Sequence, residues 1–188
     1  DGRVHLMERI EDTGVFELFI PGLAAGCGYM YEIKRQGKGT TRKLDPVSRQ
    51  ISSVPITASV VSDENMPDSY AWNDGLWMIK RKKEAGKKKP VTVYEVSLTD
   101  WLKEKSADEL VDFVKQEGYT HVCFLPVAEY LNEEMNGYST LGYFTVTHRI
   151  GGSDAFKKLV DDCHNAGIGV IIDWNGAYFG TEVKGLYD

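Results

Sequence analysis

The spacing of apolar and polar residues divides the chain into two parts with different rhythms. In the first part, which ends near residue 62, short strand-like stretches are separated by Gly and Pro, as where residues 15–20 stop at a Pro-Gly pair. Residues 28–33 and 40–44 flank a Gly-Lys-Gly turn and therefore predict a hairpin. Short strands with such punctuation indicate an antiparallel β-sandwich.

After residue 90 the pattern becomes an alternation of strands and helices. Apolar runs at 91–98, 121–127 and 168–174 predict three strands, and the third is apolar nearly throughout, which is typical of a parallel strand covered on both faces. Two amphipathic segments between these strands predict helices, while residues 128–150 predict a long loop. The order strand–helix–strand–helix–strand indicates an α/β fold with a parallel sheet.

The ends of the two predicted helices are marked by capping signals. Ser106, with Glu109 three residues later, forms a capping box at the start of the first helix, and Gly118 ends it. Asp154 precedes the second helix and Gly167 closes it. The apolar faces of the two helices are Leu110, Val111, Phe113 and Val114, and Phe156, Leu159, Val160 and Cys163.

The segment between the two parts is strongly basic. Residues 80–89 contain seven basic residues and one acidic residue and lead into Pro90. We interpret this run as a solvated linker, with an anion-binding patch as the alternative. Just before it, residues 67–83 hold several aromatic residues, which predict a loop and short helix packed against the following domain.

Composition narrows the class of protein. The 188 residues are 42% hydrophobic and 27% charged, as in an ordinary globular protein, and the formal charge of −6 argues against a general nucleic-acid binder. No apolar run reaches the roughly 18–20 residues of a membrane span, and no signal peptide is visible. The chain starts with Asp instead of Met, so we expect it to be a piece of a longer protein.

The sequence offers no cofactor or metal motif. The three cysteines lack zinc-site spacing and predict free thiols in a reducing compartment. Neither glycine-rich phosphate-binding motif occurs. We therefore expect no cofactor and no metal.

Candidate chemistry gathers after the predicted parallel strands, where α/β folds bind ligands. The segments 97–101, 129–144 and 173–179 are rich in aromatic residues, amides and carboxylates, a mixture that suits the apolar face and hydroxyls of a sugar. Each residue also has a structural interpretation, because Asp173 could cap a turn and Tyr138 or Tyr143 could be core aromatics under a loop.

Three further side chains have simpler interpretations. His121 and Cys123 share one face of their strand and are interpreted as core residues. His148 has no evident carboxylate, Ser or Cys partner, so we do not expect a nucleophile–base pair there.

These same segments resemble the 1,4-α-glucan branching enzymes, which make glycogen and belong to the α-amylase superfamily. The resemblance rests on VYEVSLTDW at 93–101, GYTHVCFLPVAE at 118–129, GYSTLGYFTVTHRIG at 137–151 and DDCHNAGIGVIIDW at 161–174. Residues 1–7, 15–22, 43–46 and 57–61 are similar to the carbohydrate-binding family 48 module that precedes the barrel. The matches at 93–101 and 163–174 favour branching enzymes over debranching or trehalose-releasing relatives.

The resemblance implies a multidomain fold. Residues 1–62 would form most of an Ig-like β-sandwich, 63–90 a linker with a short helix, and 91–188 the first part of a (β/α)8 TIM barrel, truncated after strand 3. A complete barrel takes about 200–250 residues, so this chain is too short to hold one together with a sandwich.

The resemblance also implies an activity. A branching enzyme is a cytoplasmic retaining glycosyltransferase that moves an α-1,4-glucan segment to a 6-hydroxyl and so forms an α-1,6 branch. Its partner would be an α-glucan, with no nucleic acid and no membrane. In the family, the catalytic carboxylates lie on barrel strands four and five, with a third acid after strand seven. We therefore assign no catalytic residue to this chain and expect it to be inactive alone.

Three substrate-binding positions follow from the resemblance. Tyr138 aligns with the tyrosine that stacks under the sugar, and Asp173 with the aspartate that opens the first conserved region. Tyr178 occupies the place of the histidine that closes this region. Other departures lie nearby: Ser97 and Tyr130 for His, Asn136 for Trp, Ser139 for Gln, and Asn175-Gly176 for Val-Pro. An alternative is therefore a divergent or catalytically inactive glucan-binding member of the superfamily.

Overall fold

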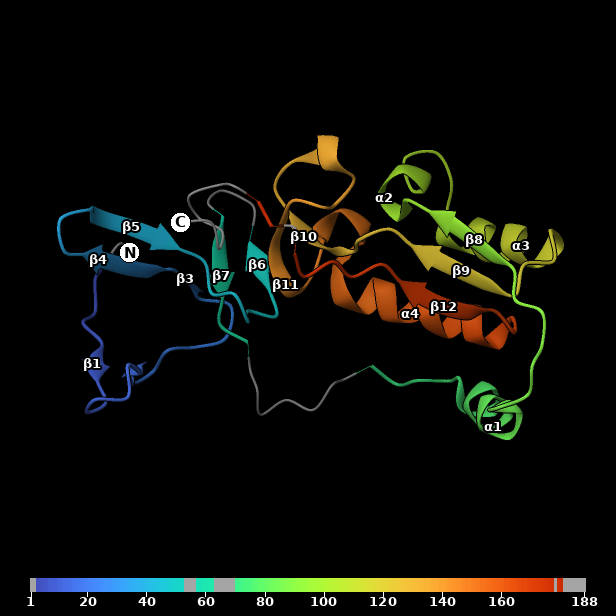
Figure 1. The fold of residues 1–188 in the computed structure, drawn as a ribbon, viewed down its shortest axis with the longest axis horizontal. Coiled ribbons are helices and arrows are strands. Elements are labelled where there is room, and N and C mark those ends of the chain that lie inside the picture. The colour runs from blue at the N-terminus through green and yellow to red at the C-terminus, as the bar shows by residue number, and fades with distance from the viewer. Residues whose placement is uncertain (1–2, 53–56, 63–69, 178, 181–188) are drawn as a thin grey trace.

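The computed structural model describes residues 3–52, 57–62, 70–177 and 179–180 (Figure 1). Its first part consists of short antiparallel strands, as predicted. These are β1 (Glu8–Arg9), β2 (Phe16–Glu17), β3 (Gly28–Tyr29), β4 (Tyr31–Arg35), β5 (Gly39–Lys43), β6 (Ile51–Ser52) and β7 (Ala58–Val60). Among the described residues, β1 pairs with β2, β4 pairs with β5, and β3, β7 and β6 form a third sheet in that order.

The hairpin predicted around the Gly-Lys-Gly turn is confirmed. Strands β4 and β5 pair from Tyr31↔Lys43 to Arg35↔Gly39. Gly37 and Gly39 both have positive φ, which glycine adopts without steric cost. The strand expected at 15–20 is wrong in length, because only Phe16–Glu17 pairs with another strand.

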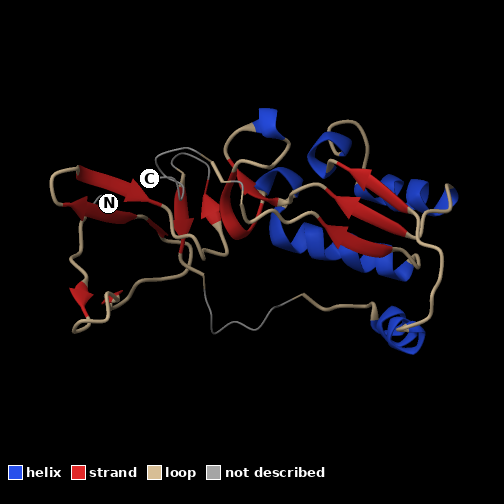
Figure 2. Cartoon of the chain, viewed as in Figure 1, coloured by secondary structure: helices blue, strands red, loops and turns tan. Residues whose placement is uncertain are grey.

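The second part contains the predicted parallel sheet (Figure 2). Strands β8 (Val93–Val96), β9 (His121–Phe124) and β12 (Gly169–Ile172) are parallel and lie in the order β12-β9-β8. Helices α3 (Ala107–Gln116) and α4 (Gly152–Asn165) connect them in sequence.

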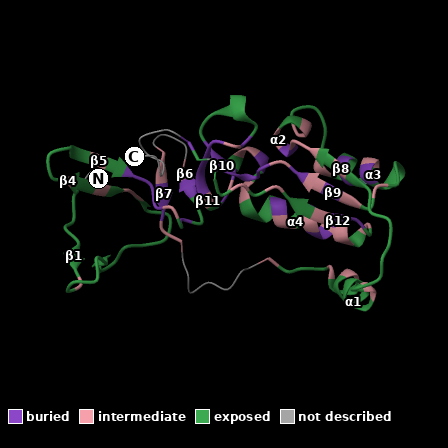
Figure 3. Cartoon of the chain, viewed as in Figure 1, coloured by how far each residue is buried: buried purple, intermediate pink, exposed green. Residues whose placement is uncertain are grey.

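Both connecting helices pack on the same face of this sheet. Val122 and Phe124 of β9 are fully buried against Leu110 and Val114 of α3 and against the apolar side chains of α4. The opposite face is more open, as Figure 3 shows. The prediction of a third strand covered on both faces is therefore wrong for the described chain: β12 lies at the edge, and Ile171 and Ile172 are 39% and 44% exposed.

His121 and Cys123 lie on this open face instead of in the core. Side chains alternate between the two faces of a strand, so these two residues point away from the helices that cover Val122 and Phe124. They are half-buried, and the interpretation of both as core residues is wrong.

Helix caps agree with the sequence signals, with one shift. At α3 the Ser106 hydroxyl accepts from the Glu109 amide and the Glu109 carboxylate accepts from the Ser106 amide, which confirms the capping box. Helix α4 begins earlier than expected, at Gly152, so that Asp154 lies in its first turn and not before it. Gly151, with φ 87°, supplies the left-handed residue that turns the chain into the helix.

The basic segment is helical over its first half. Helix α1 (Gly75–Glu84) includes Lys80 to Lys83, so the interpretation of residues 80–89 as linker is wrong there. As predicted, this helix packs against the α/β part: the Trp77 ring stacks on His164 of α4 at 3.6 Å, and Asp74 Oδ2 lies 2.7 Å from His164 Nδ1.

The stretch 128–150, which we expected to be a loop, contains a small antiparallel sheet of its own. Strands β10 (Ala128–Tyr130) and β11 (Thr140–Val146) pair antiparallel with irregular register, and they flank the short helix η1 (Glu133–Met135). The short helices η2 (His148–Ile150) and α2 (Leu98–Trp101) complete the fold.

Strand β11 is ordered by contacts that local patterns do not reveal. Its Leu141 packs with Leu44 and Ile51 of the first part, and the Thr145 hydroxyl donates to the Ser48 carbonyl at 2.7 Å. At Gly142 an added Cβ would lie 2.5 Å from Ile51 Cδ1, so the two parts of the chain touch closely here. Figure 1 shows β6 beside β11 at this contact.

Candidate functional site

The structure brings together two of the three predicted site residues. Asp173 directly follows β12, and its amide donates to the Phe124 carbonyl, so it sits at the carboxyl end of the sheet. The Tyr138 hydroxyl donates a short hydrogen bond to Asp173 Oδ2. Tyr178 lies outside the described residues.

The hydrogen bond keeps the phenol protonated further into the alkaline range. The bond to Asp173, followed by burial and the charge of Asp173, raises the pKa of Tyr138 to about 12. Tyr138 therefore remains a neutral hydrogen-bond donor at alkaline pH values where an ordinary tyrosine ionises, and its hydroxyl is coupled to the Asp173 carboxylate. Asp173 is thus a partner for a side chain and not simply the cap of a turn.

The same face of the sheet holds further polar groups. Glu95 of β8 and Cys123 of β9 are register partners on adjacent strands. Both also act electrostatically on Tyr138, while burial, Glu95 and Asp173 raise the pKa of the Cys123 thiol. Glu95 and Cys123 on the open face are therefore within electrostatic reach of the Tyr138 phenol.

Tyr138 is presented by a closed turn, residues 131–139, which we call the tyrosine loop. The Ser139 hydroxyl accepts from the Asn132 amide and donates to the Asn132 carbonyl, both at 3.2 Å, which ties the two ends of the loop together. Asn136 and Gly137 have positive φ, and an added Cβ on Gly137 would lie 2.7 Å from the Pro126 carbonyl oxygen. The loop therefore packs directly against the end of β9.

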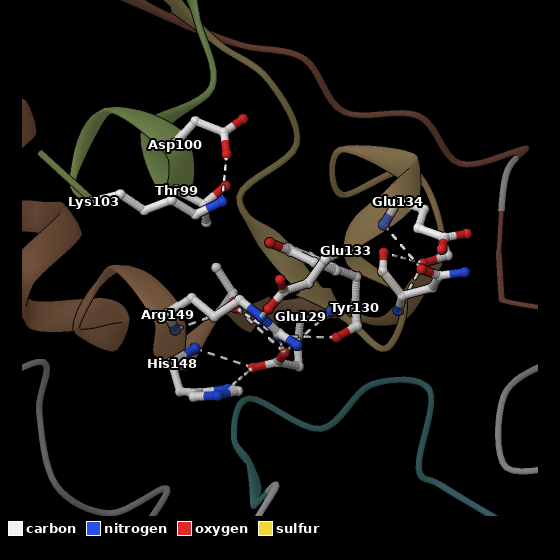
Figure 4. A network of polar contacts seen from close by, with 12 residues as sticks. Thr99, Asp100, Lys103, Glu129, Tyr130, Glu133, Glu134, His148 and Arg149 are labelled. Atoms are coloured by element: carbon white, nitrogen blue, oxygen red, sulfur yellow. Dashed lines mark hydrogen bonds and ion pairs between the residues drawn. The ribbon is translucent and has the colours of Figure 1, made fainter.

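A buried carboxylate lies at the base of the tyrosine loop (Figure 4). Glu129 is 2% exposed and accepts from the His148 amide at 3.0 Å and from Arg149 Nη1 at 2.8 Å. His148 Nδ1 also lies 2.9 Å from Glu129 Oε2.

The statement that His148 lacks a carboxylate partner is therefore wrong. Glu129 is nineteen residues away in sequence and reaches His148 only because β10 and β11 pair. The available signal was an acidic residue two positions after the strand predicted at 121–127, but its partner depends on the pairing of β10 with β11.

Beside this network, a cleft of about 250 Å³ opens between α2 and the tyrosine loop. Two ion pairs stand on its walls, Asp100 with Lys103 at 2.8 Å and Glu133 with Arg149 at 3.2 Å (Figure 4). The lining residues are Thr99, Asp100, Leu102, Lys103, Tyr130, Glu133, Asn136 and Arg149. Such a lining suits a hydroxyl-rich ligand better than an apolar one.

Aromatic side chains extend the surface near Asp173. Trp174 is exposed and meets Tyr143 edge-on, with ring centroids 5.7 Å apart. Phe144 is also exposed. Tyr143 is half-buried against Trp174, so it lies in an aromatic surface and not in the core.

Metal-ligating side chains do not gather in the described part of the chain. Among those residues, no group of three or more His, Cys, Asp or Glu could hold a metal ion. Cys27, Cys123 and Cys163 are free thiols. None of the described helices has the length and apolarity needed to cross a membrane.

Comparison with known proteins gives consistent matches. Residues 107–184 match the family model of the alpha amylase catalytic domain. The chain is 41% identical to the 1,4-alpha-glucan branching enzyme GlgB of Methylococcus capsulatus and 40% identical to that of Nitrosococcus oceani, in each case over 99% of this chain and 26% of the relative. It therefore spans about a quarter of the length of these relatives.

One solved structure supports the same likeness. A Salmonella typhimurium protein assigned as an alpha amylase superposes with a TM-score of 0.69 at 26% identity, over 95% of this chain and 29% of that chain.

Proposed function

Because this chain is related over 99% of its length to the 1,4-α-glucan branching enzymes, we propose that it forms part of a glycogen branching enzyme. Such an enzyme would transfer an α-1,4-glucan segment to a 6-hydroxyl by a retaining mechanism. The observation that supports this function best is the Tyr138–Asp173 pair at the carboxyl end of parallel strands. The proposal includes a cytoplasmic location, an α-glucan partner, and no role for nucleic acid or membrane.

We further propose that residues 91–188 are the first part of a (β/α)8 barrel and that residues 1–62 are a β-sandwich module joined by residues 63–90. Parallel strands whose connecting helices cover one face are what a barrel requires. The open face that holds Glu95 and Cys123 would then line the barrel interior.

In this proposal Tyr138 provides an aromatic platform for a glucosyl ring. The apolar face of a sugar stacks on an aromatic ring, while Asp173 fixes the rotation of the phenol by accepting its proton in a hydrogen bond. Tyr178 is proposed as a third sugar contact. The nucleophile and the acid/base, two carboxyl groups about 5 Å apart, would come from other strands of the complete barrel.

The test uses the protein encoded by the full reading frame that contains this chain. Incubation with amylose should lower the absorbance maximum of the iodine complex and create branches that a debranching enzyme releases. Tyr138→Ala should abolish most of this activity, whereas Tyr138→Phe, which keeps the ring, should retain more. The control is Tyr29→Phe, which loses a similar phenol–carboxylate bond, to Asp45, in the first part of the chain. An unchanged iodine spectrum with wild-type protein would refute the branching function.

A second candidate is a glucan-binding protein without transferase activity. Ser97 favours it, because this residue replaces a histidine of the family pattern and its hydroxyl caps α2 by accepting from the Asp100 amide. The distinguishing result is retarded migration in amylose-containing gels together with no new branches.

A further inference from the structure

We propose that Arg149 and Glu129 are positioning residues that hold the tyrosine loop so that Tyr138 reaches Asp173. Their effect on glucan transfer rests on the proposed function, whereas their effect on the loop does not. Neither residue needs to touch the substrate for this role.

Glu129 is the fixed point of the assembly. Its carboxylate is almost fully buried, and it accepts hydrogen bonds from Arg149, from the His148 amide and from the Thr147 hydroxyl. A buried carboxylate is costly unless it is paired and hydrogen-bonded. The geometry therefore ties β10, the strand that leads into the tyrosine loop, to the segment that leads into α4.

Arg149 connects this point to the loop itself. Nη1 donates to Glu129 at 2.8 Å and to the Tyr130 carbonyl at 3.1 Å, while Nε donates to Glu133 at 3.2 Å. The guanidinium also lies 4.4 Å from the centroid of the Tyr130 ring. One planar side chain with several donors thus fixes both the entry to the loop and its short helix η1.

The remaining contacts transmit this anchoring to Tyr138. Ser139 closes the loop on Asn132, and the Tyr138 amide donates to the carbonyl of Met135, the last residue of η1, at 2.9 Å. Gly137 lies against Pro126 and leaves no room for the turn to slide inward. Releasing η1 from Arg149 should therefore loosen the position of the Tyr138 phenol.

The protonation of Tyr138 reports on this position directly. The measurement is an NMR titration of the purified chain with ¹³Cζ-labelled tyrosine, in which the Tyr138→Phe variant assigns the Tyr138 signal. Tyr138 should stay protonated up to pH 11, because its pKa is raised to about 12. Arg149→Gln should lower this pKa towards the ordinary value of 10.0 and raise amide exchange in residues 131–139 about tenfold or more. Arg149→Lys should rescue part of the effect, since lysine can pair with Glu129 but lacks the planar fork.

One control variant and one second test variant accompany Arg149→Gln. Lys158→Gln removes an exposed charge paired with Asp162 on α4 and should leave the Tyr138 titration unchanged. Glu133→Gln removes a partner of Arg149. The Glu133 side chain is 69% exposed, so this substitution should raise amide exchange around η1 without unfolding the chain. If Arg149→Gln does not fold, unchanged loop exchange in Glu133→Gln overturns the proposal. If Arg149→Gln folds and its Tyr138 stays protonated at pH 11, the proposal is also overturned.

The branching assay adds a readout that a general loss of stability would not produce. In the full-length protein, Arg149→Gln should lower glucan transfer in the wild-type background but have little further effect in the Tyr138→Ala background, because it acts through Tyr138. Additive losses would contradict the positioning role. A protein that shows the Tyr138 shift but neither binds nor branches α-glucan would contradict only the proposed function.

Discussion

Replacement of Gly137 by alanine tests whether the tyrosine loop rests on the end of β9. Gly137 has φ +88°, and its added Cβ would lie 2.7 Å from the Pro126 carbonyl oxygen and 3.2 Å from Pro126 Cβ. Gly118, which follows α3, has a similar φ of +77° but no heavy atom within 4 Å of an added Cβ. The two substitutions therefore share the backbone cost and differ in the steric contact.

The expected magnitudes follow from this difference. A non-glycine residue in the left-handed region costs about 1–2 kcal/mol, which is the expected loss for Gly118→Ala. Insertion of a methyl group into a packed site costs about 1–3 kcal/mol more, so Gly137→Ala should lose about 2–5 kcal/mol unless the loop moves. If the loop moves instead, Tyr138 should lose its bond to Asp173 and titrate below its raised pKa of about 12.

Urea unfolding followed by tryptophan fluorescence measures the first outcome, and the Tyr138 titration measures the second. Equal free energies of unfolding for Gly137→Ala and Gly118→Ala, together with an unchanged Tyr138 titration, would refute the close packing of the loop on Pro126.

Three further predictions concern the α/β part. Leu110→Ala, at a side chain only 1% exposed, should lower the free energy of unfolding by about 2–5 kcal/mol in urea denaturation. Ser106→Ala should lower the free energy of unfolding by about 1 kcal/mol. The hydrogen bonds from the Ser106 amide and hydroxyl lower the pKa of Glu109 in the folded chain. Their stabilisation is therefore present above the pKa of Glu109 in the unfolded chain and is lost as the pH falls through its pKa in the folded chain. Alkylation at pH 8, followed by mass spectrometry, should modify exposed Cys27 well before Cys163, since burial raises the pKa of the Cys163 thiol to about 12.

Each of these three predictions can be contradicted by a specific result. Leu76→Ala, on the exposed side of α1, is the control for Leu110→Ala and should change stability by less than about 0.5 kcal/mol. Alanine keeps the Ser106 amide bond to Glu109, so a Ser106→Ala variant with the full acid-dependent loss of stability would contradict only the contribution of the Ser106 hydroxyl. Equal alkylation rates for Cys27 and Cys163 would contradict the burial of Cys163.

The sequence by itself determined the features that depend on neighbouring residues. The alternation of strands and helices after residue 90, the Ser106–Glu109 capping box and the turn of the β4–β5 hairpin were all predictable. Each is decided within a few residues by periodicity, capping or the conformational freedom of glycine. The resemblance to branching enzymes, which likewise needs only the order of residues, was confirmed by relatives about 40% identical over 99% of the chain.

The tertiary structure alone decided the features that join distant residues. Tyr138 and Asp173 are 35 positions apart in the sequence. Glu129 meets His148 only because β10 pairs with β11, in a stretch that the sequence pattern predicted to be a loop. Hydrogen bonds and burial at these places are set by which segments pack together, and local periodicity contains no information about that packing.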